Sequence, residues 1–227
     1  MSGPPGSRGS GSNLTSAGED YLKAMFELGG ESVKTQALAD ALEVSPASVT
    51  GMLRKLAGLG LVEHEPYAGA TLTVAGRKVA LETIRHHRLI ETYLSEALGY
   101  PWFDVHDEAE KLEHHISEEF EERIASALGH PEFDPHGDPI PGRDGQLPDQ
   151  RGGPLAGMPV GLELEITRIG RLPLELLRQL DGHGILPGGV LTLVELLDDG
   201  AAHVRTDGGA LTLAAATVNV ISVRRLP

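Results

Sequence analysis

The spacing of the apolar residues changes once along the chain, at a stretch rich in Pro and Gly that covers residues 131–159. Before this stretch, apolar residues recur mainly every three or four positions, which is the period of an amphipathic helix. After it, in residues 160–227, they alternate every second position, which predicts short strands. The sequence therefore predicts a multidomain α+β protein that ends in a small β-barrel domain.

Residues 14–80 predict an N-terminal winged helix-turn-helix domain. Ser45 is suited to cap a helix, and Pro46 is suited to be its first residue. The alternative is a generic helical core with a hairpin, but the order and lengths of the parts favour the winged helix. The expected elements are a helix over 14–30, a helix over 35–42, a helix over 46–59, and a hairpin formed by 61–64 and 70–74 with a turn at 67–69.

Residues 81–130 predict a helical metal-binding and dimerisation domain. One long helix is expected over 77–98 and a second over 105–128, each with apolar residues three and four positions apart. Two such faces need a partner surface, which a homodimer would provide. Residues 131–159 are expected to be a linker or irregular loop, and residues 1–13 a disordered lead. Five short strands are expected over 162–166, 190–196, 203–205, 210–213 and 218–223.

The chain contains no cysteine, which excludes disulfides, thiolate metal sites and cysteine nucleophiles. A metal would have to be held by imidazole and carboxylate groups, which suit Mn, Fe(II), Zn, Co or Ni. The sequence has no apolar run of about eighteen residues, so no membrane contact is expected. It also has no secretory signal, and we expect a cytoplasmic protein.

The net charge of −14 is concentrated in the middle of the chain. Residues 81–150 carry 17 Asp and Glu against 5 Lys and Arg, together with 7 of the 10 histidines. Anions mixed with imidazoles are what a divalent-cation site requires, and they are equally typical of a solvated acidic helix. The spacing of the residues has to decide between these interpretations.

Two groups of spaced ligands favour a metal site. His87 and Glu91 are four residues apart on one helix, so both side chains can reach one ion. Four further residues fall within about 100° on the wheel of the expected second helix: His106, Glu110, Glu113 and His114. A single His/Glu pair is more often a surface pair, but two such groups on neighbouring helices favour metal binding. No metal role is expected for His64, His115, His130, His183 or His203.

The expected recognition helix carries the candidate DNA contacts. Short hydroxyl donors suit phosphates or base edges, and Arg or Lys suits phosphate or guanine. Small residues on this helix suggest that DNA shape carries much of the specificity. For any single basic residue, ordinary helix solvation is an equal alternative. The candidates are Ser45, Ala47, Ser48, Thr50, Arg54 and Lys55.

Three segments resemble the diphtheria toxin repressor family of metal-dependent transcriptional regulators, and more narrowly its manganese transport regulators with an SH3-like domain. They are His86-His-Arg-Leu-Ile-Glu-Thr-Tyr-Leu94, Val105-His-Asp-Glu-Ala-Glu-Lys-Leu-Glu-His-His-Ile-Ser117 and Asp134-Pro-His-Gly-Asp-Pro-Ile-Pro141. The similarity extends from about Thr15 to Pro141 and continues more loosely into the C-terminal strands.

The resemblance implies two ligand sets. One would comprise His87, Glu91 and His106, and the other would combine Asp20 with Glu110, Glu113 and His114. Manganese-type members carry carboxylates at the positions of Asp20 and Glu110, which favours Mn²⁺ with Fe²⁺ as the alternative. Lys23 stands where those members have another glutamate, so the number of bound ions stays open. Glu175 aligns with a ligand that three-domain members lend from the SH3-like domain.

The function expected from this resemblance is metal-dependent repression by a homodimer on double-stranded operator DNA. Bound metal would fix the separation of the two recognition helices, which read half-sites about 34 Å apart. An iron-responsive repressor of the same family and a winged-helix regulator that senses no metal are the alternatives. A ferritin-like di-metal enzyme would need four carboxylate-bearing helices, and only two are expected here, so no enzyme activity is expected. No small organic ligand is expected.

Overall fold

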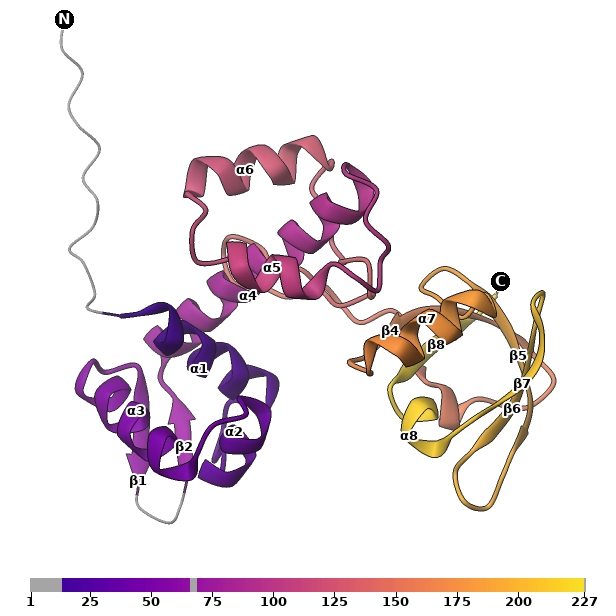
Figure 1. Cartoon of the computed structure of the whole chain (residues 1–227), viewed down its shortest axis with the longest axis horizontal. Helices are drawn as coiled ribbons and strands as arrows, with labels where there is room; N and C mark the ends of the chain where they lie inside the picture. The colour runs from indigo at the N-terminus through magenta and orange to yellow at the C-terminus, as the bar shows by residue number, and fades with distance from the viewer. Residues whose placement is uncertain (1–13, 66–68, 227) are drawn as a thin grey trace, which may run out of the picture. The chain divides into compact units, whose positions relative to one another are not determined.

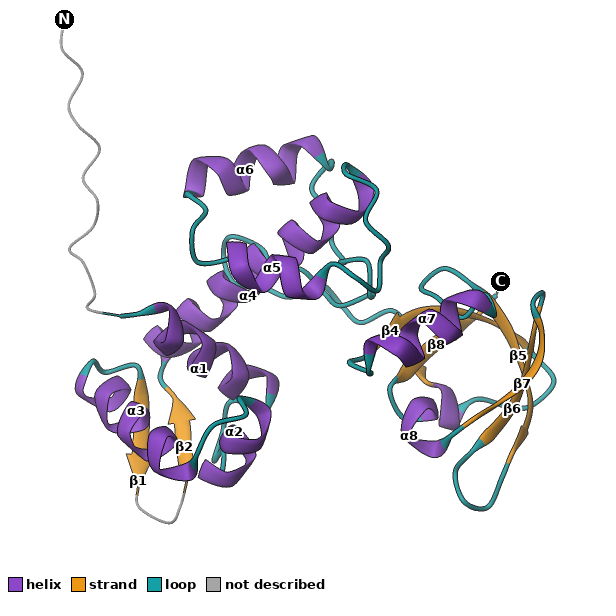
Figure 2. Ribbon diagram, in the orientation of Figure 1, coloured by secondary structure: helices purple, strands orange, loops and turns teal. Residues whose placement is uncertain are grey.

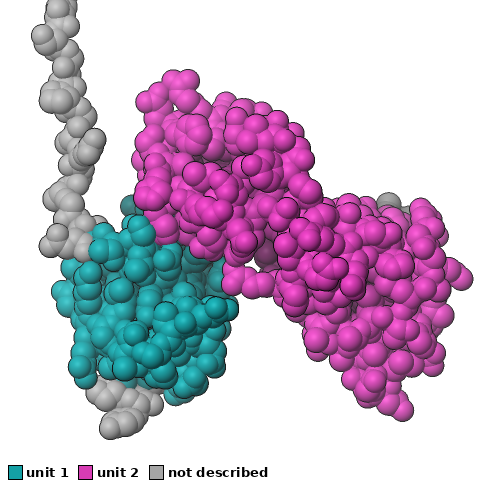
Figure 3. Space-filling view, viewed as in Figure 1, with its two compact units in different colours: residues 1–84 teal, residues 85–227 magenta. Residues whose placement is uncertain are grey.

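The computed structural model describes residues 14–65 and 69–226 and divides the chain into two compact units, residues 1–84 and 85–227 (Figure 3). The expected disordered lead at 1–13, and Tyr67 and Ala68 of the expected turn, lie outside the described residues. Among the described residues, no helix combines the length and the apolar character needed to cross a membrane.

The first unit has the expected helix-turn-helix and hairpin (Figure 1). Its elements are α1 (Ser16–Glu27), α2 (Thr35–Ala41), α3 (Pro46–Gly58), β1 (Val62–Glu65), β2 (Gly69–Leu72) and the beginning of α4 (Val74–Glu96). Ser45 caps α3, because its side chain accepts a hydrogen bond from the backbone N–H of Ser48 at 3.2 Å. Leu22, Leu38 and Leu53 are fully buried between the helices, which fixes how α3 is presented.

The hairpin of the first unit is antiparallel, with Val62 opposite Leu72 and Glu65 opposite Gly69. Gly69 has φ of 112°, and a Cβ there would lie 2.8 Å from the carbonyl oxygen of Val33. Only glycine fits this close approach. It allows Ala70 of β2 to form an isolated antiparallel bridge with Val33, which precedes α2.

The second unit begins with the remainder of α4, followed by α5 (His106–Leu112) and α6 (Glu118–Ala127). The single helix expected over 105–128 is therefore wrong, because a turn separates α5 from α6. Ser117 starts the new helix, since its side chain accepts a hydrogen bond from the N–H of Phe120. The apolar spacing hides the break because Leu112, Ile116 and Phe120 keep a four-residue interval across it.

The first part of the Pro- and Gly-rich stretch packs against α4, and we call residues 133–141 the strap. A bridge joins Phe133 to Pro139. The side chain of Arg88 on α4 donates to the carbonyl oxygen of Pro139 at 2.5 Å. Ile140 is 3% exposed in a small core with Leu89. The strap is thus irregular, as expected, but ordered by its contacts with α4.

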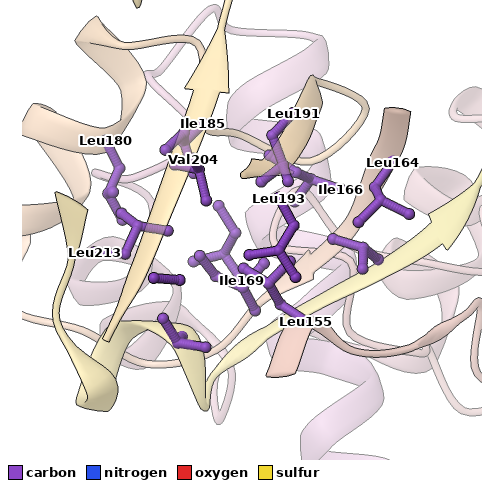
Figure 4. Close-up of a cluster of buried hydrophobic side chains, with 14 of the residues drawn as sticks. Leu155, Leu164, Ile166, Ile169, Leu180, Ile185, Leu191, Leu193, Val204 and Leu213 are labelled. Atoms are coloured by element: carbon purple, nitrogen blue, oxygen red, sulfur yellow. The ribbon is translucent and has the colours of Figure 1, made fainter. Parts of the chain in front are cut away.

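The C-terminal strands form one antiparallel sheet in the order β3-β8-β4-β5-β6-β7 (Figure 2). Their bounds are β3 Gly153–Pro154, β4 Glu163–Ile169, β5 Val190–Leu196, β6 Ala202–Thr206, β7 Gly209–Leu213 and β8 Ile221–Arg225. Irregularities in register after Ile166 and after Leu193 allow the sheet to bend around its core. Figure 4 shows leucine, isoleucine and valine side chains filling that core.

One prediction for this domain is wrong, and one helix was not predicted at all. The helix α7 (Leu174–Gly182) was not expected, and Val218 ends the short helix α8 (Ala215–Val218) instead of beginning a strand. The alanines at 214–216 favour a helical turn, because alanine has the highest helix propensity. A short 3₁₀ helix, η1 (Leu155–Gly157), follows β3 and places the fully buried Leu155 in the core.

Candidate metal centre

The centre is built on the second half of α4, where His87 and Glu91 are 6% and 2% exposed. Their four-residue spacing places both side chains on one face of the helix. The Nε2 atom of His87 lies 2.9 Å from Oε1 of Glu91. Burial raises the pKa of Glu91, but its charge interaction with His87 and hydrogen bonds from His106, His136 and His87 outweigh burial and hold the pKa well below its usual value. The carboxylate is therefore ionised and ready to bind a cation.

The first residue of α5 brings a third candidate ligand to this face. His106 Nδ1 lies 3.1 Å from Nε2 of His87 and 3.2 Å from Oε1 of Glu91. Metal bonds of about 2.1 Å place neighbouring octahedral ligand atoms about 3.0 Å apart. The three atoms therefore have the separations of ligands that share one ion. Glu110 lies one turn further along α5, with its Oε1 3.6 Å from Nε2 of His106.

The hydrogen bonds of His87 also indicate that a cation can bind at its Nε2 atom. Its Nδ1 hydrogen-bonds a carboxylate oxygen of Glu113, while its Nε2 faces Glu91. A neutral imidazole has one N–H, so a hydrogen bond to Glu113 leaves the Nε2 lone pair facing another anion. A proton or a metal ion must lie there to remove the repulsion. A carboxylate behind a ligating histidine is also the usual arrangement that orients such a ligand.

The strap supplies two residues that the sequence reasoning did not assign to the centre. Nδ1 of His136 lies 3.6 Å from Oε2 of Glu91 and 4.0 Å from Oδ1 of Asp134. Glu91, Asp134 and His136 each offer a ligand atom within 4.8 Å of the others. The Asp-Pro-His spacing in the third resembling segment was the available signal, but an irregular segment has no period that indicates where its side chains point.

The charge balance of the strap depends on burial. Burial, together with the neighbouring carboxylates of Glu91 and Asp138, raises the pKa of Asp134 to about 7. Burial lowers the pKa of His136, but its hydrogen bond to Glu91 and the nearby carboxylates raise the pKa above its usual value overall. The strap thus places proton-holding groups beside the ionised Glu91, and a dication would displace these protons.

The second expected ligand set is brought together only in part within the second unit. Glu113 is 1% exposed, and its Oε1 lies 3.4 Å from Nε2 of His114. Both residues belong to the turn after α5 rather than to the expected continuous helix. His86 fixes this turn, since its Nδ1 lies 3.2 Å from the carbonyl oxygen of Glu113. Asp20 belongs to α1 of the other unit, and its part in this set stays a prediction.

The C-terminal domain places a different residue beside the centre from the one expected. Glu175 is exposed in the first turn of α7 and belongs to none of the ligand groups found among the described residues. Arg171 instead places a guanidinium nitrogen 2.8 Å from Nε2 of His106. Glu175 as a ligand stays a prediction, and no sequence pattern indicated Arg171.

The candidate DNA contacts lie on or beside α3 in the first unit. Ala47, Ser48, Arg54 and Lys55 are exposed, while the buried residues of α3 are Val49, Leu53 and Leu56. Ser45 and Ser48 are engaged in the helix cap, with their Oγ atoms 2.9 Å apart. The hydroxyl of half-buried Thr50 donates to the carbonyl oxygen of Pro46. The exposed face of α3 therefore presents small residues followed by two cations.

Comparison with known families assigns most of the chain. Residues 13–70 match the iron dependent repressor N-terminal DNA binding domain, and residues 73–142 match the iron dependent repressor metal binding and dimerisation domain. Residues 153–225 match the FeoA domain.

Whole-chain relatives agree with these matches. The diphtheria toxin repressor of Corynebacterium glutamicum is 30% identical over 210 residues, which are 87% of this chain and 91% of the relative. The iron-dependent repressor IdeR of Mycobacterium tuberculosis is 31% identical over 213 residues, 88% and 89% of the two chains.

Solved structures of similar proteins cover nearly the same length. A manganese-dependent transcriptional repressor in complex with manganese is 38% identical, with a TM-score of 0.84 over 92% of this chain and 100% of the other. The structure of ScaR with bound Zn²⁺ is 32% identical, with a TM-score of 0.79 over 92% and 99% of the two chains.

Proposed function

The chain belongs to the iron-dependent repressor family, is a metal-dependent transcriptional repressor rather than an enzyme, and we propose from this premise that Mn²⁺ is the metal that activates it. The observation that carries the proposal is the ligand triangle of His87 Nε2, Glu91 Oε1 and His106 Nδ1, with sides of 2.9, 3.1 and 3.2 Å. Its donors are oxygen and nitrogen atoms, and the chain has no thiolate that would favour a softer metal.

A bound dication supplies positive charge that offsets the carboxylates of the centre. The residues of the protein do the remaining work. Glu91 contributes one oxygen to the triangle and faces His136 of the strap with the other, so it joins α4, α5 and the strap at one point. His87 connects this point to Glu113 through its other ring nitrogen. We propose that this arrangement makes the two predicted ligand sets, one with Glu91 and one with Glu113, respond together.

The first unit carries the residues that would contact DNA. We propose that Arg54 and Lys55 contact phosphates or guanine, while Ala47 and Ser48 let the helix approach the base edges closely. The family binds operator DNA and dimerises, and we propose a homodimer for this chain. Exposed apolar side chains of the second unit support this, since Phe120 on α6 is 48% exposed and Leu98 is 55% exposed. The predicted ligand Asp20 on α1 would place part of the metal response within the DNA-binding unit.

A metal titration of DNA binding tests this proposal. Duplexes are first selected from a random pool by the manganese-loaded protein, and binding is then measured by fluorescence anisotropy with Mn²⁺, Fe²⁺, Zn²⁺ or a chelator. We expect Mn²⁺ to support binding and the chelator to abolish it. His87→Ala should bind DNA weakly, and Mn²⁺ should no longer strengthen its binding. Equal DNA binding in chelator and in Mn²⁺ would refute metal activation, and activation by Fe²⁺ alone would refute the choice of metal.

A further inference from the structure

The contact between Arg171 and His106 is not explained by the ligand set. Arg171 belongs to the connection between β4 and α7, residues 170–173, and is exposed. Its guanidinium nitrogen lies 2.8 Å from Nε2 of His106. An arginine has no lone pair to offer and always donates, so Nε2 of His106 must be the acceptor. The proton of the neutral ring is then on Nδ1, where it can be donated to Glu91 Oε1 at 3.2 Å.

This proton arrangement cannot coexist with a bound metal. If His106 ligates through Nδ1, its single proton moves to Nε2, and that N–H then points at an arginine N–H. If His106 ligates through Nε2, the lone pair that Arg171 uses is taken. Either choice breaks the hydrogen bond, and the guanidinium also repels the incoming dication. Arg171 therefore lies beside the centre, on the ring nitrogen of His106 that faces away from the triangle, as a tethered cation that must release His106 when a metal ion binds.

The connection that carries Arg171 is held close to the strap. The N–H of Ile169 donates to the carbonyl oxygen of His136 at 2.9 Å, and Arg168 Nε lies 2.6 Å from Oδ1 of Asp138. Gly137 has φ of 85°, and a Cβ there would lie 2.0 Å from the carbonyl oxygen of Thr167. The end of β4 thus lies directly against the strap, so Arg171 has a fixed base from which to reach His106.

A further contact joins this domain to the helical part. Trp102, which precedes α5, donates from Nε1 to Oδ1 of Asp181 on α7 at 2.7 Å. Its ring lies 5.7 Å from the ring of His136. Trp102 is the single tryptophan of the chain. Its fluorescence therefore reports on the surroundings of the centre.

We propose that Arg171 is a built-in competitor of the activating metal, which links metal binding to release of the β4–α7 connection from His106. The proposal rests on the proposed function, because it needs a divalent cation at the centre. Because the metal can bind only when the Arg171–His106 contact breaks, the free energy of that contact reduces the free energy of metal binding. This contact would set the threshold at which the repressor responds.

Titration of the metal-free full-length protein with MnCl₂ tests the proposal. Paramagnetic Mn²⁺ quenches a nearby tryptophan, so Trp102 fluorescence gives the dissociation constant. Arg171→Gln should bind Mn²⁺ about threefold to tenfold more tightly than wild type, as expected for losing one charge-assisted hydrogen bond near the surface. Arg171→Glu should tighten binding further, because it replaces the competing cation with a carboxylate.

Arg178→Gln is the matched control. It removes the same charge from the same domain, and Arg178 contacts Asp104 and Phe103 rather than the ligand group. Its affinity should equal that of wild type. Wild-type affinity in both Arg171 variants, or equal tightening in Arg178→Gln, would overturn the proposal while leaving the proposed function intact. A wild-type protein that binds no Mn²⁺ at all would instead overturn the proposed function, and this inference with it.

Discussion

Glu121 of α6 is expected to contribute a measurable, pH-dependent part of the stability of the second unit. The residue is 2% exposed, and its carboxylate lies 2.6 Å from Nε of Arg85 and 3.0 Å from Nε2 of His86. Burial raises its pKa, but hydrogen bonds from His86 and Arg85 and their charges outweigh burial and lower the pKa from 4.5 to about 2. These contacts hold α6 against α4 next to the candidate ligand His87.

The size of the effect follows from the change in pKa. At about 1.4 kcal/mol per pH unit, a fall in pKa from 4.5 to about 2 corresponds to about 3 kcal/mol of stabilisation. Solvent screening reduces this to about 2 kcal/mol. Because the folded pKa is the lower one, the stabilisation is complete above pH 4.5 and is lost as the pH falls towards 2. By pH 3 roughly 40% of it should remain.

Urea unfolding followed by Trp102 fluorescence measures this contribution, since Trp102 lies in the second unit. Glu121→Gln should lower the free energy of unfolding by about 2 kcal/mol at pH 7, and the difference from wild type should narrow at pH 3. Glu119→Gln is the control, because Glu119 forms an exposed ion pair with Arg123 on the same helix and should change stability by less than about 0.5 kcal/mol. A loss at pH 7 equal to that of Glu119→Gln, or a difference that does not narrow in acid, would refute the reasoning.

Three further substitutions test other parts of the molecule. Glu113→Gln should weaken Mn²⁺ binding in calorimetry by about 10- to 100-fold, because Glu113 orients His87; an affinity within twofold of that of Glu108→Gln, an exposed change on α5, would contradict this role. Ser45→Ala should cost the first unit about 1 kcal/mol in thermal unfolding followed by circular dichroism, since it removes the cap of α3; unchanged unfolding would show that the cap is unimportant. Arg54→Ala should weaken binding to different duplexes by similar factors and reduce the salt dependence by about one counterion, whereas an effect confined to one sequence would indicate a base contact.

The sequence predicted the helix-turn-helix well because local signals agree there. A cap residue and a proline mark the start of α3, and the apolar period separates Val49, Leu53 and Leu56 from the exposed face. The same period failed at the turn after α5. Apolar contacts at regular intervals say which face is buried, but they do not say whether the backbone stays helical between them.

That His87, Glu91 and His106 lie together could be predicted because two of them share one helix face and the third opens the next helix; their role as metal ligands stays a prediction. The strap residues Asp134 and His136 could not be placed in the same way. Their positions depend on long-range contacts of the strap, such as that between Arg88 and Pro139, and on the glycine at 137. The contact of Arg171 with His106 joins residues 65 positions apart, and no local pattern indicates it.

Anomalous X-ray scattering from crystals of the manganese-loaded protein tests the central claim most directly. We expect a manganese peak within bonding distance of His87 Nε2, Glu91 and His106, with Arg171 turned away from the imidazole ring. A well-ordered triangle with no anomalous peak beside it in saturating Mn²⁺ would contradict the account.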